Sequence, residues 1–307
     1  MVKYICKRLL IMIPTLIFII FMIYCILSLI PGTPGRIMLG ANAPAEQVEQ
    51  MNQALGFYDP LPVKFARYLW DALHGDFGES YKYSKPVFDL LLPKFPVTVL
   101  LALLSCLVSA VIGIPVGIIS AVKKHSLADH TSTVIAMLLG SMPSFFLGVL
   151  MILLFSLKLG WLPSNGLGTW KNYIMPVLTL ALPSAAYLSR MTRTTMLDAM
   201  EQDYIRTARA KGCSPMRIIF RHGLRNALMP VVTSLGMSFA GLLGGALITE
   251  QVFGLPGFGE SILAAIQTKD IPVIMGSSVF LATLFMLIML VVDLLYAVLD
   301  PRVGATY

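Results

Sequence analysis

Six long apolar stretches constrain this chain more than any other feature of its sequence. A helix needs about 20 mostly apolar residues to cross a hydrocarbon core ~30 Å thick, and in lipid its backbone polar groups must be paired within the segment. We therefore expect an all-α integral membrane protein with six transmembrane helices. The fourth stretch is the shortest and contains two prolines. The six stretches are Leu9–Ile30, Val97–Val122, Thr133–Leu157, Tyr173–Leu188, Leu228–Thr249 and Val273–Leu299.

The low charge agrees with this fold class. Only 13% of the 307 residues are charged and 57% are hydrophobic, whereas a soluble domain carries about 25% charged residues. A net charge of +7 also occurs in nucleic-acid-binding proteins, but here the basic residues lie between apolar stretches, which favours a membrane. No two cysteines are closely spaced, so we expect neither a disulfide nor a zinc framework; they are Cys6, Cys25, Cys106 and Cys213.

The first apolar stretch has two interpretations. Its basic start is typical of a signal peptide, but its length and the Pro-Gly-Thr-Pro-Gly segment that follows it are not. We favour a retained helix. On this interpretation residues 1–30 form an N-terminal tail and the first transmembrane helix, 31–96 an extracytoplasmic segment, and 97–307 a five-helix core.

The distribution of basic residues orients the chain, because Lys and Arg accumulate in short cytoplasmic loops. Fourteen of them lie at the N-terminus, at 123–124, in the stretch 190–225 and near the C-terminus, whereas three lie in the short loops of the opposite side. We therefore predict that both termini are cytoplasmic and that the long segment Pro31–Pro96 lies outside.

The segment Pro31–Pro96 is too apolar to be disordered. Two parts of it, Pro44–Leu55 and Pro62–His74, have the pattern of short amphipathic helices. A cap over the outer helix ends and a docking or gating surface explain this pattern equally well. The apolar residues expected on one face of the second helix are Phe65, Leu69 and Leu73.

The cytoplasmic loop 190–228 contains signals for helix ends. Asp203 is an N-cap candidate for a helix over Tyr204–Lys211, and Gly212 is a candidate for its left-handed stop. The Ser-Pro pair at 214–215 then begins a second predicted short helix, which ends at Ala227.

These two helices are expected to meet at a sharp corner on the inner face of the membrane. The first carries several basic side chains, so one interpretation is contact with anionic lipid headgroups. A docking site for another protein is the other interpretation. The compact corner favours docking, because a helix lying on lipid does not need one. The basic residues are Arg206, Arg209 and Lys211.

The extracytoplasmic stretch Gln251–Pro272 contains the apolar, glycine-rich run Phe253-Gly-Leu-Pro-Gly-Phe-Gly259. A connection that faces only water does not need two phenylalanines. Irregular backbone is tolerated at membrane depth where it contacts protein or a water-filled path. We predict an apolar loop that folds back into the path through the membrane, and the candidates for an outer gate are Phe253, Pro256 and Phe258.

Small residues recur at four-residue spacing within two spans, which lets helix backbones approach closely. We interpret these rows as helix-packing faces. They are Gly113 with Gly117, Gly241 with Gly245, and Gly236 with Ala240 and Gly244.

Two carboxylates lie in or at the end of a span: Glu250 closes the fifth stretch and Asp293 lies inside the sixth. Intramembrane carboxylates are candidates for a functional role. For Asp293 we favour a structural role as a hydrogen-bond acceptor between helices.

Several enzyme motifs are missing. The dipeptide Gly-Lys never occurs, which excludes the Gly-x-x-x-x-Gly-Lys phosphate loop. There is no His-Glu-x-x-His motif and no cysteine cluster with metal-ligand spacing. We therefore expect no catalytic residues, no metal site and no ATP hydrolysis by this chain.

The segments Asp203–Gly212 and Arg221–Pro230 together resemble the cytoplasmic loop of ABC importer permeases, and in particular of the dipeptide, oligopeptide and nickel transport family. The resemblance covers nearly the whole chain. Further matching segments are Ile30–Pro34, Leu55–Pro60, Gly75–Gly78, Arg190–Arg193, Asp293–Tyr296 and Asp300–Arg302.

One part of the family pattern is not kept. The general importer motif is Glu-Ala-Ala, three residues, then Gly; Ala208 and Gly212 match it, but Arg206 and Thr207 stand where Glu and Ala would. The peptide-type branch shows the same departure. Because Arg206 stands in place of the glutamate, a salt bridge made by that glutamate in other importers cannot be carried over to this chain.

The resemblance implies the type I ABC importer permease fold in the plasma (inner) membrane of a prokaryote. A second homologous permease would complete the path, two cytoplasmic ATPase subunits would bind ATP and Mg²⁺, and an extracytoplasmic binding protein would deliver short peptides. This chain would hold no cofactor. Its coupling helix would sit in an ATPase groove, with the site residues Asp203, Tyr204, Arg206, Ala208, Arg209 and Gly212.

Two alternatives remain at this stage. A permease for nickel or a nickel chelate belongs to the same family; the sequence has no His or Asp cluster for a bare ion, but a chelate would need none. A membrane-embedded enzyme or receptor would require a polar catalytic group within the spans or a large outer ligand domain, and neither is evident.

Overall fold

The computed structural model describes residues 2–299. The predicted cytoplasmic C-terminus and the segment Asp300–Arg302 lie outside the described residues. The described chain is helical and forms two compact units, one of Thr98–Leu255 with the chain from Leu287 on, the other of Val2–Val97 with Pro256–Met286. The division into 1–30, 31–96 and 97–307 stays a prediction.

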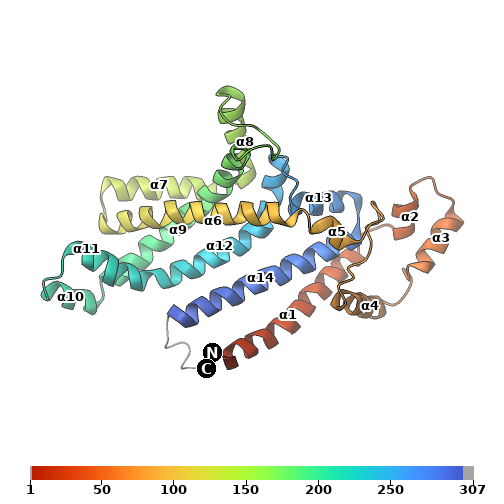
Figure 1. The fold of residues 1–307 in the computed structure, drawn as a ribbon, viewed down its shortest axis with the longest axis horizontal. Helices are drawn as coiled ribbons and strands as arrows, with labels where there is room; N and C mark the ends of the chain where they lie inside the picture. Colours follow the sequence, from red (N-terminus) through yellow and green to blue (C-terminus); the bar gives the residue numbers. More distant parts are fainter. Residues whose placement is uncertain (1, 300–307) are drawn as a thin grey trace. The chain divides into compact units, whose positions relative to one another are not determined.

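The first unit holds most of the long helices. In Figure 1, α6, α7, α9 and α12 run side by side, and α8 stands away from α7. The helices are α6 Phe95–Val122, α7 Leu127–Ser141, α8 Ser144–Met151, the π-helix η1 Ile152–Lys158, α9 Lys171–Met200, α10 Asp203–Ala210, α11 Pro215–Arg217, the π-helix η2 Ile218–Leu224 and α12 Arg225–Val252.

The second unit contains the first long helix and the segment that follows it. Its helices are α1 Val2–Ser28, α2 Pro34–Leu39, α3 Ala45–Ala54, α4 Leu61–Leu73, α5 Val87–Leu91 and α13 Phe258–Thr268. The last helix, α14 Ile271–Leu299, begins in this unit and ends in the first.

Within residues 2–299, five helices are long and apolar enough to cross a membrane, or six candidate spans if the bent pair α7 and α8–η1 is counted as one. That pair corresponds to the third apolar stretch, which is therefore not one straight helix. It bends by 101°, because Pro143 disfavours the helical conformation of the residue before it and Met142 is extended at φ −82°, ψ 128°.

The fourth stretch behaves differently from the prediction of a short, interrupted helix. α9 is 30 residues long and keeps both Pro176 and Pro183 inside it. Of the five straight candidates it has the lowest hydropathy, and 56% of its most apolar 18-residue segment is buried, the largest share among them. A helix that packs against protein rather than lipid needs fewer apolar residues, which explains why its apolar stretch is shorter than the helix.

The segment 31–96, called the outer segment after its predicted side of the membrane, contains the two predicted short helices, as α3 and α4, and two that were not predicted, α2 and α5. Phe65 of α4 packs edge-on against Phe21 and Tyr24 of α1, with ring centroids 5.1 and 5.8 Å apart. Leu73 is 75% exposed, so the predicted apolar face of α4 does not extend to its last turn.

An unpredicted buried carboxylate joins the outer segment to the start of α14. Asp270 is 1% exposed and accepts hydrogen bonds from the Ser80 hydroxyl at 2.5 Å and from the backbone N–H groups of Tyr81 and Lys82 at 3.1 and 3.3 Å. Burial, together with the nearby negative charge of Asp270, raises the pKa of Tyr81 to about 12.

Residues 253–257 of the predicted apolar loop have irregular backbone, but the loop is shorter than predicted, because the helix α13, which was not predicted, follows it. α13 begins at Phe258, carries Glu260 in its first turn, and buries Ile262 and Ala265 on one face. These residues suit a helix, and the irregular backbone is confined to the few residues before it.

Candidate functional site

The loop 190–228, which we predict to be cytoplasmic, forms a corner built from the end of α9, the short helix α10 and the start of α11. α10 covers Asp203–Ala210, close to the predicted range. We define this corner, residues 200–218, as the α10 corner.

One face of α10 anchors the corner. Ile205 is 0% exposed and Ala208 6%, and they pack with Ile218 of η2 in a small apolar cluster that Met200 and Cys213 also contact. Ala208, predicted as a residue of the docking surface, therefore faces inward. Its small side chain lets α10 lie close against η2.

The other face of α10 is exposed. Tyr204 is 40% exposed, and Arg206 and Arg209 also point outward. Arg206 lies 3.4 Å from Asp203 in an ion pair whose side chains are 78% and 94% exposed, so this pair contributes little to stability. The exposed face is thus basic and polar, with one aromatic residue.

Asp203 does not cap α10 as predicted. It is the first residue of the helix, and the N-cap is Gln202, whose side chain makes no capping hydrogen bond. A carboxylate in the first turn still interacts favourably with the helix dipole.

Gly212 ends the helix in the left-handed region, as predicted, with φ +73°. The backbone N–H of Gly212 donates to the carbonyl oxygen of Arg209 at 3.0 Å, and that of Cys213 donates to Ala208 at 3.1 Å. A Cβ atom added at Gly212 would meet nothing within 4 Å. Backbone conformation, and not lack of space, is therefore what requires glycine here.

The second helix of the corner is not short, which corrects the prediction that it ends at Ala227. It begins at Pro215 with Ser214 as N-cap, continues through the π-helix η2 and runs on as α12 to Val252. α10 is consequently attached to the end of a long helix, and a displacement of α10 acts on that helix directly.

Beneath the corner lies a second apolar cluster of Ala121, Met196, Ala199 and Ala227, from α6, α9 and α12. Met200 packs against this cluster and against the one that anchors α10. The two clusters are therefore continuous through one side chain.

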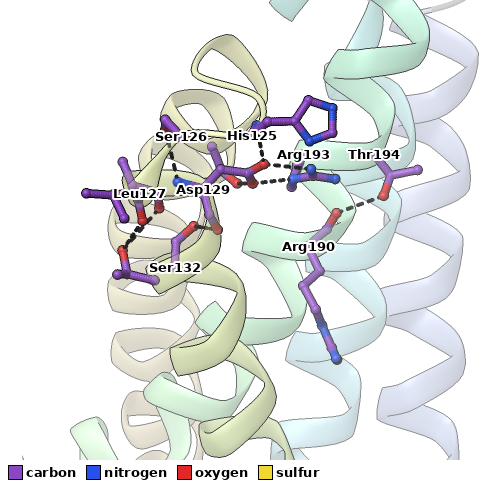
Figure 2. A network of polar contacts seen from close by, with 11 residues as sticks. His125, Ser126, Leu127, Asp129, Ser132, Arg190, Arg193 and Thr194 are labelled. Atoms are coloured by element: carbon purple, nitrogen blue, oxygen red, sulfur yellow. Dashed lines mark hydrogen bonds and ion pairs between the residues drawn. The ribbon is translucent and has the colours of Figure 1, made fainter.

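A buried ion pair joins α7 to α9 on the same side of this unit as the α10 corner (Figure 2). Asp129 is 3% exposed, and its two carboxylate oxygens accept hydrogen bonds from Nε and Nη2 of Arg193 at 2.7 and 2.9 Å. Arg190, one turn earlier, points away from this pair. Asp129 was not predicted from the sequence, because Arg193 is 64 residues away and no local pattern connects the two.

The gate candidates are mostly buried. Phe253 is 1% exposed and lies beside Gly148 of α8. Phe258 is also 1% exposed and packs against Phe95 and Phe280 with centroids 6.3 and 5.3 Å apart, whereas Pro256 is exposed. Their gating role stays a prediction.

The two intramembrane carboxylates differ in burial. Glu250 is 0% exposed and accepts a hydrogen bond from the Thr98 hydroxyl at 2.5 Å, so it connects α12 to α6. Asp293 is partly buried on α14. Within residues 2–299 no group of three or more His, Cys, Asp or Glu side chains is arranged to hold a metal ion.

The glycine rows divide into contacting and open positions. An added Cβ at Gly113 or Gly117 would lie within 2.7 Å of α9 backbone oxygens, so α6 and α9 approach closely as predicted. Gly236 lies against Val292, but Gly241 and Gly244 have nothing within 4 Å in the described chain. The packing prediction for the row containing Gly241 finds no support within this chain.

Comparison with known proteins gives consistent matches over the whole length. The family model described as "Binding-protein-dependent transport system inner membrane component" matches residues 113–305, and the model of the N-terminal part of such membrane components matches residues 1–102. The glutathione transport system permease protein GsiC of Escherichia coli (strain K12) is 41% identical over 303 residues, which is 99% of both chains.

Two solved structures share the fold. A chain of the inward-facing MetNI methionine ABC transporter superposes with a TM-score of 0.59 at 23% identity, covering 69% of this chain and 96% of its own. A chain of an amino acid ABC transporter crystallised with histidines gives 0.56 at 15% identity, covering 68% and 93%.

Both family models, the full-length relative and the shared helical fold agree with the resemblance carried by the α10 corner. The chain belongs to the family of binding-protein-dependent transport system inner-membrane components, and it is a multi-pass permease subunit of an ABC importer with the type I permease fold.

Proposed function

We propose that this permease forms half of a translocation path for short peptides, with glutathione among its substrates. The support is the 41% identity to a glutathione permease over 99% of both chains. Glutathione is itself a tripeptide, so this assignment and the peptide-type resemblance of the sequence describe the same class of substrate.

The α10 corner is the observation that carries the mechanism. It has a buried anchor, Ile205 and Ala208, and an exposed face with Tyr204, Arg206 and Arg209. This arrangement suits a helix that seats in a groove of a cytoplasmic ATPase subunit. ATP and Mg²⁺ would be bound by two such subunits, and their ATP-driven closure would displace α10.

The remaining partners follow from the same mechanism. A second homologous permease completes the path, and an extracytoplasmic binding protein delivers substrate to the side that carries the outer segment. Cytoplasmic termini would place the α10 corner on the side of the ATPase subunits. The permease pair would switch between an inward-facing and an outward-facing arrangement, and the nucleotide state of the ATPases would determine which one is populated.

The test is the complete transporter reconstituted in vesicles with ATP inside and the binding protein outside. We expect uptake of glutathione and di- or tripeptides, and ATP hydrolysis that rises when the binding protein is loaded. Uptake of nickel or a nickel chelate, with none of these peptides transported, would contradict the peptide assignment. The ligand that co-purifies with the binding protein provides an independent check.

A further inference from the structure

We propose that Asp129 and Arg193 form a register lock, a contact that fixes α6, α7 and α9 to one another so that displacement of α10 moves them as one body. This inference rests on the proposed function, because the role of the lock would be to pass a displacement of α10 on to α6, α7 and α9. Arg193 and Asp129 would be positioning residues that act through the helices and touch neither ATP nor substrate.

The carboxylate of Asp129 connects three helices and a turn. Oδ1 accepts from the Ser120 hydroxyl of α6 at 2.5 Å and from Nε of Arg193 at 2.7 Å. Oδ2 accepts from Nη2 of Arg193 at 2.9 Å and from the backbone N–H of His125 at 2.9 Å. Each oxygen therefore has two donors, and these come from α6, the α6–α7 turn and α9 (Figure 2).

The turn itself is shaped for this contact. His125 has a positive φ of 64°, a conformation that residues other than glycine seldom adopt. Its side chain is exposed, and its N–H donates to Asp129. The backbone of the turn thus contributes to holding the carboxylate.

Burial and geometry make the contact rigid. The Asp129 side chain is 4% exposed and that of Arg193 28%. A bidentate pair of a guanidinium and a carboxylate fixes orientation as well as distance, and a buried charge that loses its partner is strongly unfavourable. Sliding α9 along α7 by even part of a helical turn would break both bonds at once.

α6 also meets α9 by close packing. Gly113 and Gly117 of α6 lie against the backbone of Ala185 and Ser189 and against the side chains of Leu188 and Thr192. Such packing favours a range of relative helix positions, whereas the ion pair adds bonds that act only in one geometry.

The lock lies near the start of α7 and near the end of α9, the helix that leads to the α10 corner. α9 is continuous from Arg193 to Met200, a distance of about 10 Å along the helix. Met196 and Met200 occupy the two clusters beneath α10. A displacement of α10 reaches α9 through Met200, and the lock passes it to α6 and α7.

The alternative is a purely structural role, in which the pair only stabilises the fold. Replacing both members of a buried ion pair by apolar residues often leaves stability unchanged, whereas removing one member does not. The double variant Asp129→Leu/Arg193→Met therefore separates the two roles, because it keeps an apolar contact but removes the directional bonds.

The experiment uses the reconstituted transporter with the double variant, with Asp129→Asn and with the conservative variant Arg193→Lys. Four quantities are measured at matched expression: co-purification of the ATPase subunits, basal ATP hydrolysis, stimulation of hydrolysis by the loaded binding protein, and uptake. For the double variant we expect normal co-purification and basal hydrolysis, but at least a tenfold loss of stimulation and uptake; Arg193→Lys should retain part of both.

The matched control is Lys124→Gln, which lies outside the α10 corner and breaks the exposed pair of Lys124 and Glu201 at 3.9 Å. That pair connects the same turn to the end of α9, and its loss should leave stimulation within twofold of the wild type. If the double variant transports normally, or if all three variants fail to accumulate or to bind the ATPase subunits, the register lock is wrong. If the wild-type chain itself does not bind ATPase subunits, the proposed function is wrong instead.

Discussion

At the scale of single residues, the α10 corner depends on backbone conformation at Gly212. Its φ of +73° lies in the left-handed region, and there is free space where a side chain would begin. A substitution here therefore tests conformation without creating a clash, and the residue lies in an exposed corner away from the spans.

We predict that Gly212→Val costs about 1–3 kcal/mol of local strain, because a β-branched residue is disfavoured at positive φ. The variant should accumulate in the membrane but bind the ATPase subunits weakly and lose transport, which co-purification and uptake at matched expression would measure. Gly212→Asn is the control, since asparagine tolerates this conformation better, and it should retain most of the binding. Equal, wild-type behaviour of both variants would show that α10 does not seat in an ATPase groove.

At the scale of elements, the close contact of α6 and α9 allows a second prediction. A Cβ atom at Gly117 would lie 2.6 Å from the backbone oxygen of Ser189 and from Cβ of Thr192. Gly117→Leu should separate the two helices, and overpacking of this kind costs roughly 1–3 kcal/mol or more. We expect reduced accumulation and a lower unfolding temperature of the detergent-purified chain.

The control for that prediction is Gly241→Ala on α12, which meets nothing within 4 Å in the described chain. It should accumulate normally. A Gly117→Leu variant as stable as the Gly241→Ala variant would mean that the contact of α6 with α9 is not required for folding.

A third prediction concerns the gate candidates. Phe253 and Phe258 are both buried, so replacing them with alanine removes packing as well as any gate, at about 3–5 kcal/mol for a fully buried phenylalanine. If they gate the path, Phe253→Leu/Phe258→Leu should keep most of the packing and still raise basal ATP hydrolysis or leak. A leucine variant with wild-type hydrolysis, leak and stimulation would show that both phenylalanines serve packing and do not gate the path.

At the scale of the whole molecule, the predicted orientation places the outer segment and the α10 corner on opposite sides of the membrane. A reporter that is active only in the cytoplasm should be active after Tyr307 and silent at Asn42. Asn42 lies in an exposed turn between α2 and α3, and an insertion there spares Asn52, which is buried and accepts a hydrogen bond from the N–H of Gly35. Activity at Asn42 would reverse the orientation and remove the argument for ATPase docking.

The sequence by itself determined the features that depend on local composition and on the limits of the backbone. Apolar stretches identified the long helices because crossing a hydrocarbon core requires length and apolarity, and Gly212 was recognisable because few other residues end a helix in the left-handed region. The short helices α3 and α4 were predicted for the same reason, since proline and the amphipathic pattern act within a few residues.

The tertiary structure alone decided which distant groups meet. It placed Ala208 inward, made α9 longer than its apolar stretch, and joined Asp129 to Arg193 and Asp270 to Ser80, pairs separated by 64 and 190 residues. Such pairs leave no local pattern, because the chosen partner depends on how whole helices lie against one another. In a bilayer, van der Waals packing brings helices together wherever their surfaces fit, whereas a hydrogen bond or ion pair acts only at short range and in one geometry.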